Sequence, residues 1–464
     1  MQIVKKYAAI LFILAVFPIA QFIANNFVLE EGNEIYAYIP QDSDFVIEIN
    51  VQNFATELAY QRIFSENYFK EKVYPKEEED VKNRQVKTGI DLFSKVVLFR
   101  EQWANETIWI AILKYADKKE LQKFISSRVP DAQFQFNQKY AIVQLSPSSS
   151  QKKLDEHLKK ISAKEIKSFN ERVNLADIFD PKKEINCFII PKTRPDNALI
   201  EGYLSFDFLK DHIQIEGAFT PIPSFNETEP IAYAVDKNKA FSLRSSLNLF
   251  NSIYLFNQEK LENVPAYSQM AFDYNGIDCQ MVDRKLGFST PFISFPKINL
   301  HFDILDKTPW YAYFDSLQMN KDIMVDTTKK TFITSQGAMF SYVLNDNAFE
   351  LSQDSVSFTQ SVDSNLYFDL YMEIDPLLNN TTFEVNKKNP PSKIEQSLGL
   401  MVANELMNQI RQMANIEWIE FNLEKTKEDE ITATGRIEMK EKNGHAMVES
   451  LAFGISALVF VKDY

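Results

Sequence analysis

The hydrophobic pattern divides the chain into a short apolar N-terminal segment and a long mixed region. Residues 7–24 are apolar at all but two positions, and apolar residues resume at 27–29. A helix of about 20 apolar residues spans a bilayer core. Lys5 and Lys6 precede this segment and acidic residues follow it, so the positive-inside rule places the N-terminus in the cytoplasm. The pattern therefore predicts one membrane helix through residues 7–29.

A cleaved signal peptide is the alternative interpretation of this segment. Its apolar core would be long, and a cut after Ala20 would place Pro18 at the unfavourable position three residues before the cut. No cysteine stands near the segment, so the lipid attachment of a lipoprotein has no acceptor. We expect the anchor to remain attached, and both interpretations export the rest of the chain.

Beyond the anchor, alternating apolar residues predict strands, and similar elements recur in the same order in two halves. A strand that begins at Phe45 has a counterpart at Phe241, and a closing hairpin that contains Phe206 has a counterpart that contains Phe421. The other recurring landmarks are a Gly-Ile-Asp tripeptide (89–91 and 276–278), a strand leading into a helix (108–125 and 298–317), a strand (140–145 and 348–351) and a helix (150–171 and 392–414).

The predicted fold class is α+β, with one N-terminal transmembrane helix followed by two duplicated domains of antiparallel sheet with helices packed on one face. Prolines that frame a polar stretch mark a linker between the halves. The predicted parts are a membrane anchor and juxtamembrane segment (1–34), a first α+β domain (35–220), a Pro-rich linker (221–230), a second α+β domain (231–445) and an apolar C-terminal helix (446–464).

The C-terminal segment is a candidate interaction site because large apolar side chains recur there at helical spacing. Residues 446–461 are too few for an ordinary membrane span. We expect an amphipathic helix that packs on its own domain or docks on a partner or the membrane surface. The candidate partner-binding residues are Val448, Leu451, Phe453, Ile455, Leu458 and Val459.

Composition and charge narrow the classes of function. Only 11 of the 464 residues are glycine, and no glycine-rich phosphate-binding motif occurs, which disfavours nucleotide enzymes. A net charge of −14 would repel nucleic acid. Cys187 and Cys279 are the only cysteines, and each lies in a strand-like run, so a buried free thiol and a single bridge are both open.

No spacing of residues points to a catalytic, cofactor-binding or metal site, and we expect none. The acidic run at 77–80 is typical of an exposed loop or a weak cation site, without the alternating ligands of a calcium loop. Aromatic residues around Trp103 and at 310–314 suit a binding platform, but core packing is the favoured interpretation. The histidines lack metal-binding spacing and are expected to be surface or packing residues: His157, His212, His301 and His445.

Three short motifs resemble those of uncharacterised membrane-anchored or lipoprotein envelope proteins of Gram-negative bacteria, which are known as domains of unknown function. They are Ile-Pro-x-Asp-x-x-Phe-Val-Ile-x-Ile-Asn at 39–50, Gly-Ile-Asp at 89–91 and the closing strand at 435–440. The resemblance implies a location in the envelope and an α+β fold, and it implies no activity. The lipid-attachment cysteine common in that group is missing, which implies a different anchor.

These observations predict a non-enzymatic, membrane-anchored scaffold or binding subunit of a cell-envelope assembly. The expected topology is single-pass in the inner membrane, with the N-terminus cytoplasmic and the bulk of the chain periplasmic. The expected partners are the inner membrane, through residues 7–29, and an envelope protein, with no nucleic acid. Two alternatives remain open: a carbohydrate-active hydrolase with paired carboxylates in an aromatic cleft, and a carrier with an apolar cavity.

Overall fold

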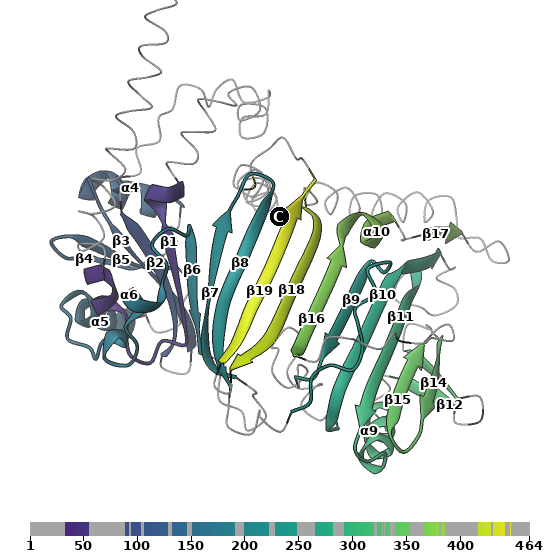
Figure 1. Ribbon diagram of the computed structural model, residues 1–464. Coiled ribbons are helices and arrows are strands. Elements are labelled where there is room, and N and C mark those ends of the chain that lie inside the picture. The colour runs from purple at the N-terminus through teal and green to yellow at the C-terminus, as the bar shows by residue number, and fades with distance from the viewer. Residues whose placement is uncertain are drawn as a thin grey trace, which may run out of the picture. The chain divides into compact units, whose positions relative to one another are not determined.

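A computed structural model describes most of the chain between Asn33 and Ala446 (Figure 1). Antiparallel strands dominate the described residues and helices are few, which confirms the predicted antiparallel α+β class at this level. Residues outside the description are the two ends, 1–32 and 447–464, and internal stretches of which the longest are 55–88, 248–264 and 386–415.

The chain forms two compact units. Unit 1 comprises Met1–Ile190 and Tyr203–Asp207, and unit 2 comprises Pro191–Gly202 and Phe208–Tyr464. This division differs from the predicted domain limits because the strand at His212–Pro221, expected in the first domain, pairs along its length with Glu430–Met439 of unit 2. β7 (Leu199–Phe208) contributes residues to both units.

Unit 1 is an antiparallel sheet centred on β1, which pairs with β2 on one side and with β6 on the other. From β2 the pairing continues through β3 and β5 to β4. In pairing order the strands are β4 (Phe134–Phe136), β5 (Tyr140–Gln144), β3 (Glu106–Lys114), β2 (Lys95–Trp103), β1 (Phe45–Asn50) and β6 (Ile185–Ile189).

Helices cover both faces of the unit 1 sheet, so the prediction of helices on one face is wrong there. α4 (Lys118–Arg128) packs Leu121 and Ile125 on Ala111 and Leu113 of β3. α5 (Gln151–Ser162) belongs to a second core cluster, which contains the intervening residues of β3, Ile110 and Ile112. The physical reason lies in β3 and β5, which are apolar on both faces and therefore need cover on both.

The second core cluster is closed by short helices near β1 and β6. They are the 3-10 helices η1 (Asn33–Tyr38) and η3 (Phe169–Glu171) and the one-turn helix α6 (Leu175–Ile178). The Ser168 side chain caps η3, with Glu171 completing a capping box. The backbone N–H of Phe169 donates to the carbonyl of Ile39 at 2.8 Å, so η3 is fastened to the chain that leaves η1.

Unit 2 is a wider antiparallel sheet centred on β9, which pairs with β10 and β16. β17 (Thr382–Val385) adds a short parallel pairing to the end of β10. In pairing order the other strands are β12 (Ile323–Asp326), β13 (Thr331–Thr334), β14 (Met339–Leu344), β15 (Ala348–Ser352), β11 (Phe292–Ile304), β10 (Tyr267–Met281), β9 (Phe241–Ser245), β16 (Leu366–Glu373), β18 (Ile416–Lys427), β19 (Glu430–Met439) and β8 (His212–Pro221).

An aromatic core lies under α9 (Thr308–Met319) of unit 2. Trp310 and Phe314 pack against Phe302 of β11 and Phe349 of β15. The ring centroids of Trp310 and Phe314 both lie 5.1 Å from that of Phe349, and they lie 6.1 Å from each other. Trp310 is 1% exposed and Phe314 is also buried, so core packing is confirmed for these two aromatic residues at the helix start, whereas Tyr311 is 49% exposed. A second helix, α10 (Ile374–Asn379), follows β16.

Several predicted segments lie outside the described residues. They are the anchor at 7–29, the tail beyond Ala446, the acidic run at 77–80, most of the linker and the helix expected at 392–414. Among the residues that the structure does describe, no helix combines the length and apolar character needed to cross a membrane.

Candidate functional site

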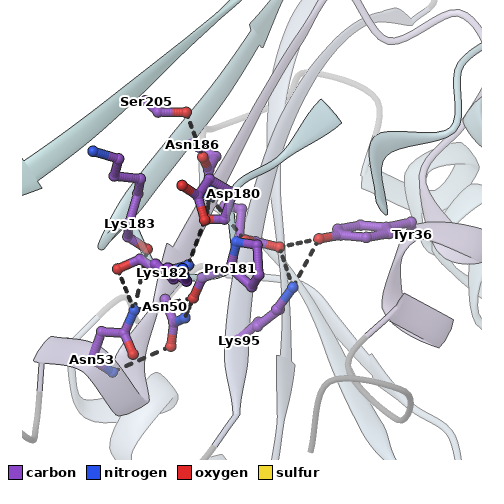
Figure 2. Close-up of polar contacts among 11 residues, drawn as sticks. Tyr36, Asn50, Asn53, Lys95, Asp180, Pro181, Lys182, Lys183, Asn186 and Ser205 are labelled. Atoms are coloured by element: carbon purple, nitrogen blue, oxygen red, sulfur yellow. Dashed lines mark hydrogen bonds and ion pairs between the residues drawn. The ribbon is translucent and has the colours of Figure 1, made fainter. Parts of the chain in front are cut away.

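A buried polar cluster lies at the centre of the unit 1 sheet, on the face of β1 that carries Val46 of the second core cluster (Figure 2). Glu48 of β1 is 0% exposed. Its carboxylate accepts hydrogen bonds from the Tyr36 hydroxyl and from the Asn186 amide, the latter at 3.2 Å, and it pairs with Lys95 Nζ at 3.0 Å. Lys95 also donates to the Tyr36 oxygen at 3.0 Å. Three side chains, from η1, β2 and β6, thus meet at one carboxylate on β1.

The cluster extends to the chain that leads into β6. Asn186 accepts a 2.6 Å hydrogen bond from Ser205 of β7 and donates to the carbonyl of Asp180 at 3.0 Å. Asn50, at the end of β1, donates to the carbonyl of Pro181 at 2.9 Å. These contacts, visible in Figure 2, fix the turn before β6 to the end of β1.

The chemistry of this cluster fits a role in stabilising the fold of unit 1. Burial, together with the charge and hydrogen bond of Glu48, raises the pKa of Tyr36 far above its ordinary value, so Tyr36 remains a neutral donor. A buried ion pair is tolerated when further hydrogen bonds satisfy both partners, as they do here. Neither Glu48 nor Asn186 offers exposed surface to a substrate, since both are 0% exposed.

Unit 2 has a second buried cluster, centred on Arg244 of β9, which is 1% exposed. Its guanidinium pairs with Asp273 of β10 at 2.8 Å and donates to the carbonyl of Ala234 at 2.9 Å. Ser242 donates to the same Asp273 oxygen at 2.7 Å. The ring of Phe358 lies over the guanidinium, 4.9 Å from its centroid.

A histidine cluster lies on the same unit. His301 of β11 is 6% exposed, and its ring nitrogens contact two carboxylates from opposite edges. Nδ1 lies 3.1 Å from Glu350 of β15, and Nε2 lies 3.0 Å from Asp303 and 3.1 Å from the Tyr233 hydroxyl. Burial favours the neutral ring, but the hydrogen bonds and charges of the two carboxylates outweigh burial and raise the pKa of His301.

A further contact between a histidine and a carboxylate joins α5 to β2 in unit 1. His157 contacts Glu101, which is 4% exposed, and stacks on Trp103 with ring centroids 5.5 Å apart. The sequence predicted packing or surface roles for the histidines, and His157 and His301 do pack, but as members of charged clusters. His212 contacts Asp211 at 2.7 Å in a turn, and His445 lies outside the description.

These clusters were missed because spacing along the chain gives no sign of them. Tyr233 and Glu350 stand 68 and 49 residues from His301. The one local signal is the pair His301 and Asp303, two residues apart on one strand and therefore on one face. Within the described ranges no group of three or more His, Cys, Asp or Glu residues can hold a metal ion. The carboxylates of Asp303 and Glu350 contact different nitrogens, so these three groups do not converge on one point.

The predicted partner-binding residues are not placed by the structure, since all six follow Ala446. Ala446 itself is fully buried, and its N–H donates to the carbonyl of Leu209 at 3.2 Å. The tail therefore starts from a fixed point on unit 2. Cys187 is a buried free thiol, and burial raises its pKa to about 12, so it is inert at neutral pH.

Comparison with protein-family models, curated proteins and solved structures finds no match to this chain. The resemblance to envelope proteins therefore rests on the short sequence motifs alone. Any function has to be argued from the residues themselves.

Proposed function

We propose that this protein is a membrane-anchored, extracytoplasmic scaffold or binding subunit of a cell-envelope assembly, and that it works without catalysis. The observation that carries the proposal is the way the chain directly after the predicted anchor is built into unit 1. Ile35, Tyr36, Tyr38 and Ile39 are at most 6% exposed. Tyr36 is tied to Glu48 and Lys95 in the middle of the sheet.

The junction between the predicted anchor and unit 1 is short. Residues 30–32 separate the end of the predicted membrane segment from η1, and three residues extend over about 10 Å. Glu34 is held by Lys139 at 2.8 Å and by Lys164 at 3.2 Å. A link of this length, followed directly by the ion-paired Glu34 and the buried η1, would hold unit 1 at a fixed height above the membrane, which suits a scaffold better than a freely tethered enzyme.

The proposal also includes duplication of the two units. The order β4-β5-β3-β2-β1-β6 in unit 1 parallels β14-β15-β11-β10-β9-β16 in unit 2. Phe45 and Phe241 are the first residues of the matching central strands. The buried Ile35 precedes Phe45 by the same distance as the buried Ile231 precedes Phe241. Repeated units give an assembly two related surfaces on one chain.

The hydrolase alternative has one point of support and one obstacle. Asp303 and Glu350 form a carboxylate pair beside the aromatic rings of Tyr233 and Phe358. A glycosidase needs open space between its carboxyl groups for the scissile bond or a water. The imidazole of His301 occupies that space, hydrogen-bonded to both. The scaffold proposal is therefore favoured.

The test is purification of the full-length chain from native membranes after mild cross-linking. We expect an envelope protein to co-purify at fixed stoichiometry, and protease added to spheroplasts to degrade the region after residue 34. Leu451→Ser with Ile455→Ser, on the apolar side of the tail, should abolish co-purification, whereas the control Glu449→Gln should not. Protection of the chain from external protease would contradict the location. An undiminished yield of partner from the double variant would contradict the role of the tail.

A further inference from the structure

We propose that His301 is a proton-operated latch that fastens the segment before β9, residues 230–236, to the polar face of the unit 2 sheet. The latch consists of His301, Asp303, Glu350 and Tyr233. It goes beyond the scaffold proposal, and its geometry does not depend on that proposal.

The latch joins three separate parts of unit 2. His301 and Asp303 lie on β11, Glu350 lies directly opposite His301 on β15, and Tyr233 comes from the segment before β9. The rings of Tyr233 and Phe358 flank the imidazole with centroids 5.1 and 5.7 Å away. The imidazole is therefore largely shielded from water, and each of its nitrogens lies within hydrogen-bond distance of a carboxylate.

The number of protons on His301 decides how these bonds are satisfied. An imidazolium has two N–H donors, which match Glu350 at Nδ1 and Asp303 at Nε2. The neutral ring has a single N–H, so one carboxylate loses its donor. With Nδ1 protonated, the Nε2 lone pair faces Asp303 and competes with it for the hydroxyl proton of Tyr233. Loss of one proton from His301 thus removes one hydrogen bond to a carboxylate and changes the acceptor available to the Tyr233 hydroxyl.

Other charged groups around the latch do not offset this change. On β9, Arg244 contacts the ring of Phe358 and is paired with Asp273 of β10 at 2.8 Å. The raised pKa of Tyr233, caused by burial and by the charges of Asp303 and Glu350, keeps its hydroxyl protonated. His301 is therefore the group in this cluster whose ordinary pKa lies nearest to neutral pH, and its pKa is raised from that value.

The segment held by the latch also covers the Arg244 cluster. Ala232 N–H donates to Gln269 at 2.7 Å, Ala234 accepts from Arg244 at 2.9 Å, and Asp236 N–H donates to Ser242 at 2.9 Å. Tyr233 contributes the remaining tie, through His301. The latch is closed while His301 is charged, and it loosens as the pH rises through the raised pKa. Loosening would admit water to the segment between Ala232 and Ala234.

Hydrogen exchange of the full-length protein in detergent, followed by mass spectrometry from pH 5.5 to 8.5, tests the latch. After correction for intrinsic exchange, amides of residues 230–236 should be about threefold to tenfold better protected at the acidic end, since one pKa unit corresponds to a factor of ten. His301→Gln should remove this pH dependence. The control His212→Gln, which removes a histidine paired with one carboxylate in a turn, should retain it. Equal pH dependence in His301→Gln, or none in the wild type, would overturn the proposal.

A second variant covers the case in which His301→Gln misfolds. Glu350→Gln preserves shape and removes one charge from a half-exposed position. In the NMR titration of the four histidines, the resonance lost in His301→Gln identifies His301. Its midpoint should lie above the ordinary value of about 6.5 in the wild type and should fall in Glu350→Gln. A wild-type midpoint at or below that value would contradict the proposal.

Discussion

The central strand of each unit carries one buried charged residue that pairs with the neighbouring strand, and the sign of that charge differs between the units. Glu48 is the fourth residue of β1 and pairs with Lys95 of β2, whereas Arg244 is the fourth residue of β9 and pairs with Asp273 of β10. Each pair is buried and supported by hydroxyl donors. The sign of the charge differs, but a satisfied ion pair is present in both. A buried ion pair of this kind favours the correct strand register, because a strand that slipped by one residue would leave a buried charge unpaired.

The two units differ more in what covers these pairs. In unit 1, residues 145–184 between β5 and β6 form α5, η3 and α6, which close the core. In unit 2, the stretch between β15 and β16, residues 353–365, is much shorter. Cover there includes Tyr233 and Phe358, held beside His301. Unit 1 is therefore closed mainly by apolar burial, and unit 2 depends more on polar ties.

The largest expected effect comes from leaving a buried charge without its partner. Glu48→Ala removes the acceptor for Lys95 and Tyr36, and should destabilise unit 1 by about 3 to 5 kcal/mol. Urea unfolding monitored by hydrogen exchange separates the two units. Amides of β1 and β2 should lose protection at lower urea, while those of β9 and β10 should not change. Equal loss in both units would contradict independent clusters.

Replacing the whole pair in unit 2 sharpens the comparison. Arg244→Met alone leaves Asp273 buried and unpaired, and should cost about 3 to 5 kcal/mol. Adding Asp273→Leu should recover most of that loss, because apolar residues of similar volume often replace a buried pair at little cost. The urea midpoint of unit 2 measures both. If the double variant is no more stable than the single one, the pair does more than satisfy its own charges.

A smaller effect is expected at the junction with the predicted anchor. Tyr36→Phe keeps the ring and removes the hydroxyl that donates to Glu48, which should lower stability by about 1.5 to 3 kcal/mol. Exchange at residues 33–39 is the measurement. The matched control is Tyr38→Phe, at a buried tyrosine whose ring lies 4.6 Å from Lys164 Nζ. Similar exchange in the two variants would show that the hydroxyl of Tyr36 does not fasten η1.

The smallest effect should be the pH dependence of unit 2. The folded-state pKa of His301 is raised, so the charged ring contributes stability below the ordinary pKa, and this contribution is lost as the pH rises through the folded pKa. The urea midpoint of unit 2 should therefore fall between pH 5.5 and 8.5. The fall should be absent in His301→Gln, and a rise over that range would reverse the predicted sign.

The sequence predicted the strands better than the helices that pack on the faces of the sheet. Alternation at Phe45–Ile49 identified β1, whereas the uninterrupted apolar runs of β3 and β5, which required helices on both faces, were not used. Contacts such as Asn186 with Glu48 join residues 138 positions apart, beyond the reach of any local pattern. The C-terminal segment was chosen because its apolar residues recur at helical spacing. That spacing predicts an apolar helix face but does not identify the surface that packs against it.

Two of the six recurring landmarks do not occupy matching places. Gly89 precedes β2, has a φ of 69° and lies so close to α4 that an added Cβ would meet the Leu121 nitrogen at 2.3 Å. Gly276 instead lies inside β10, at a register shift. The helix predicted at 150–171 precedes β6, whereas the one predicted at 392–414 follows β16, which pairs with β9 as β6 pairs with β1. Short matching motifs can thus arise from unrelated local requirements.

The pairing of β1 with β6 has a consequence for how the chain folds. The hydrogen bond between Glu48 and Asn186 joins residues 138 positions apart, and in unit 2 the one between Ser246 and Tyr367 joins residues 121 positions apart. Contacts so distant in sequence slow folding, because the loop must close before the contact forms. A chain threaded through a membrane from its N-terminus would expose one edge of β1 for most of the passage of unit 1. Such an edge invites pairing with other chains, so each unit should need a holding chaperone until its closing strand emerges.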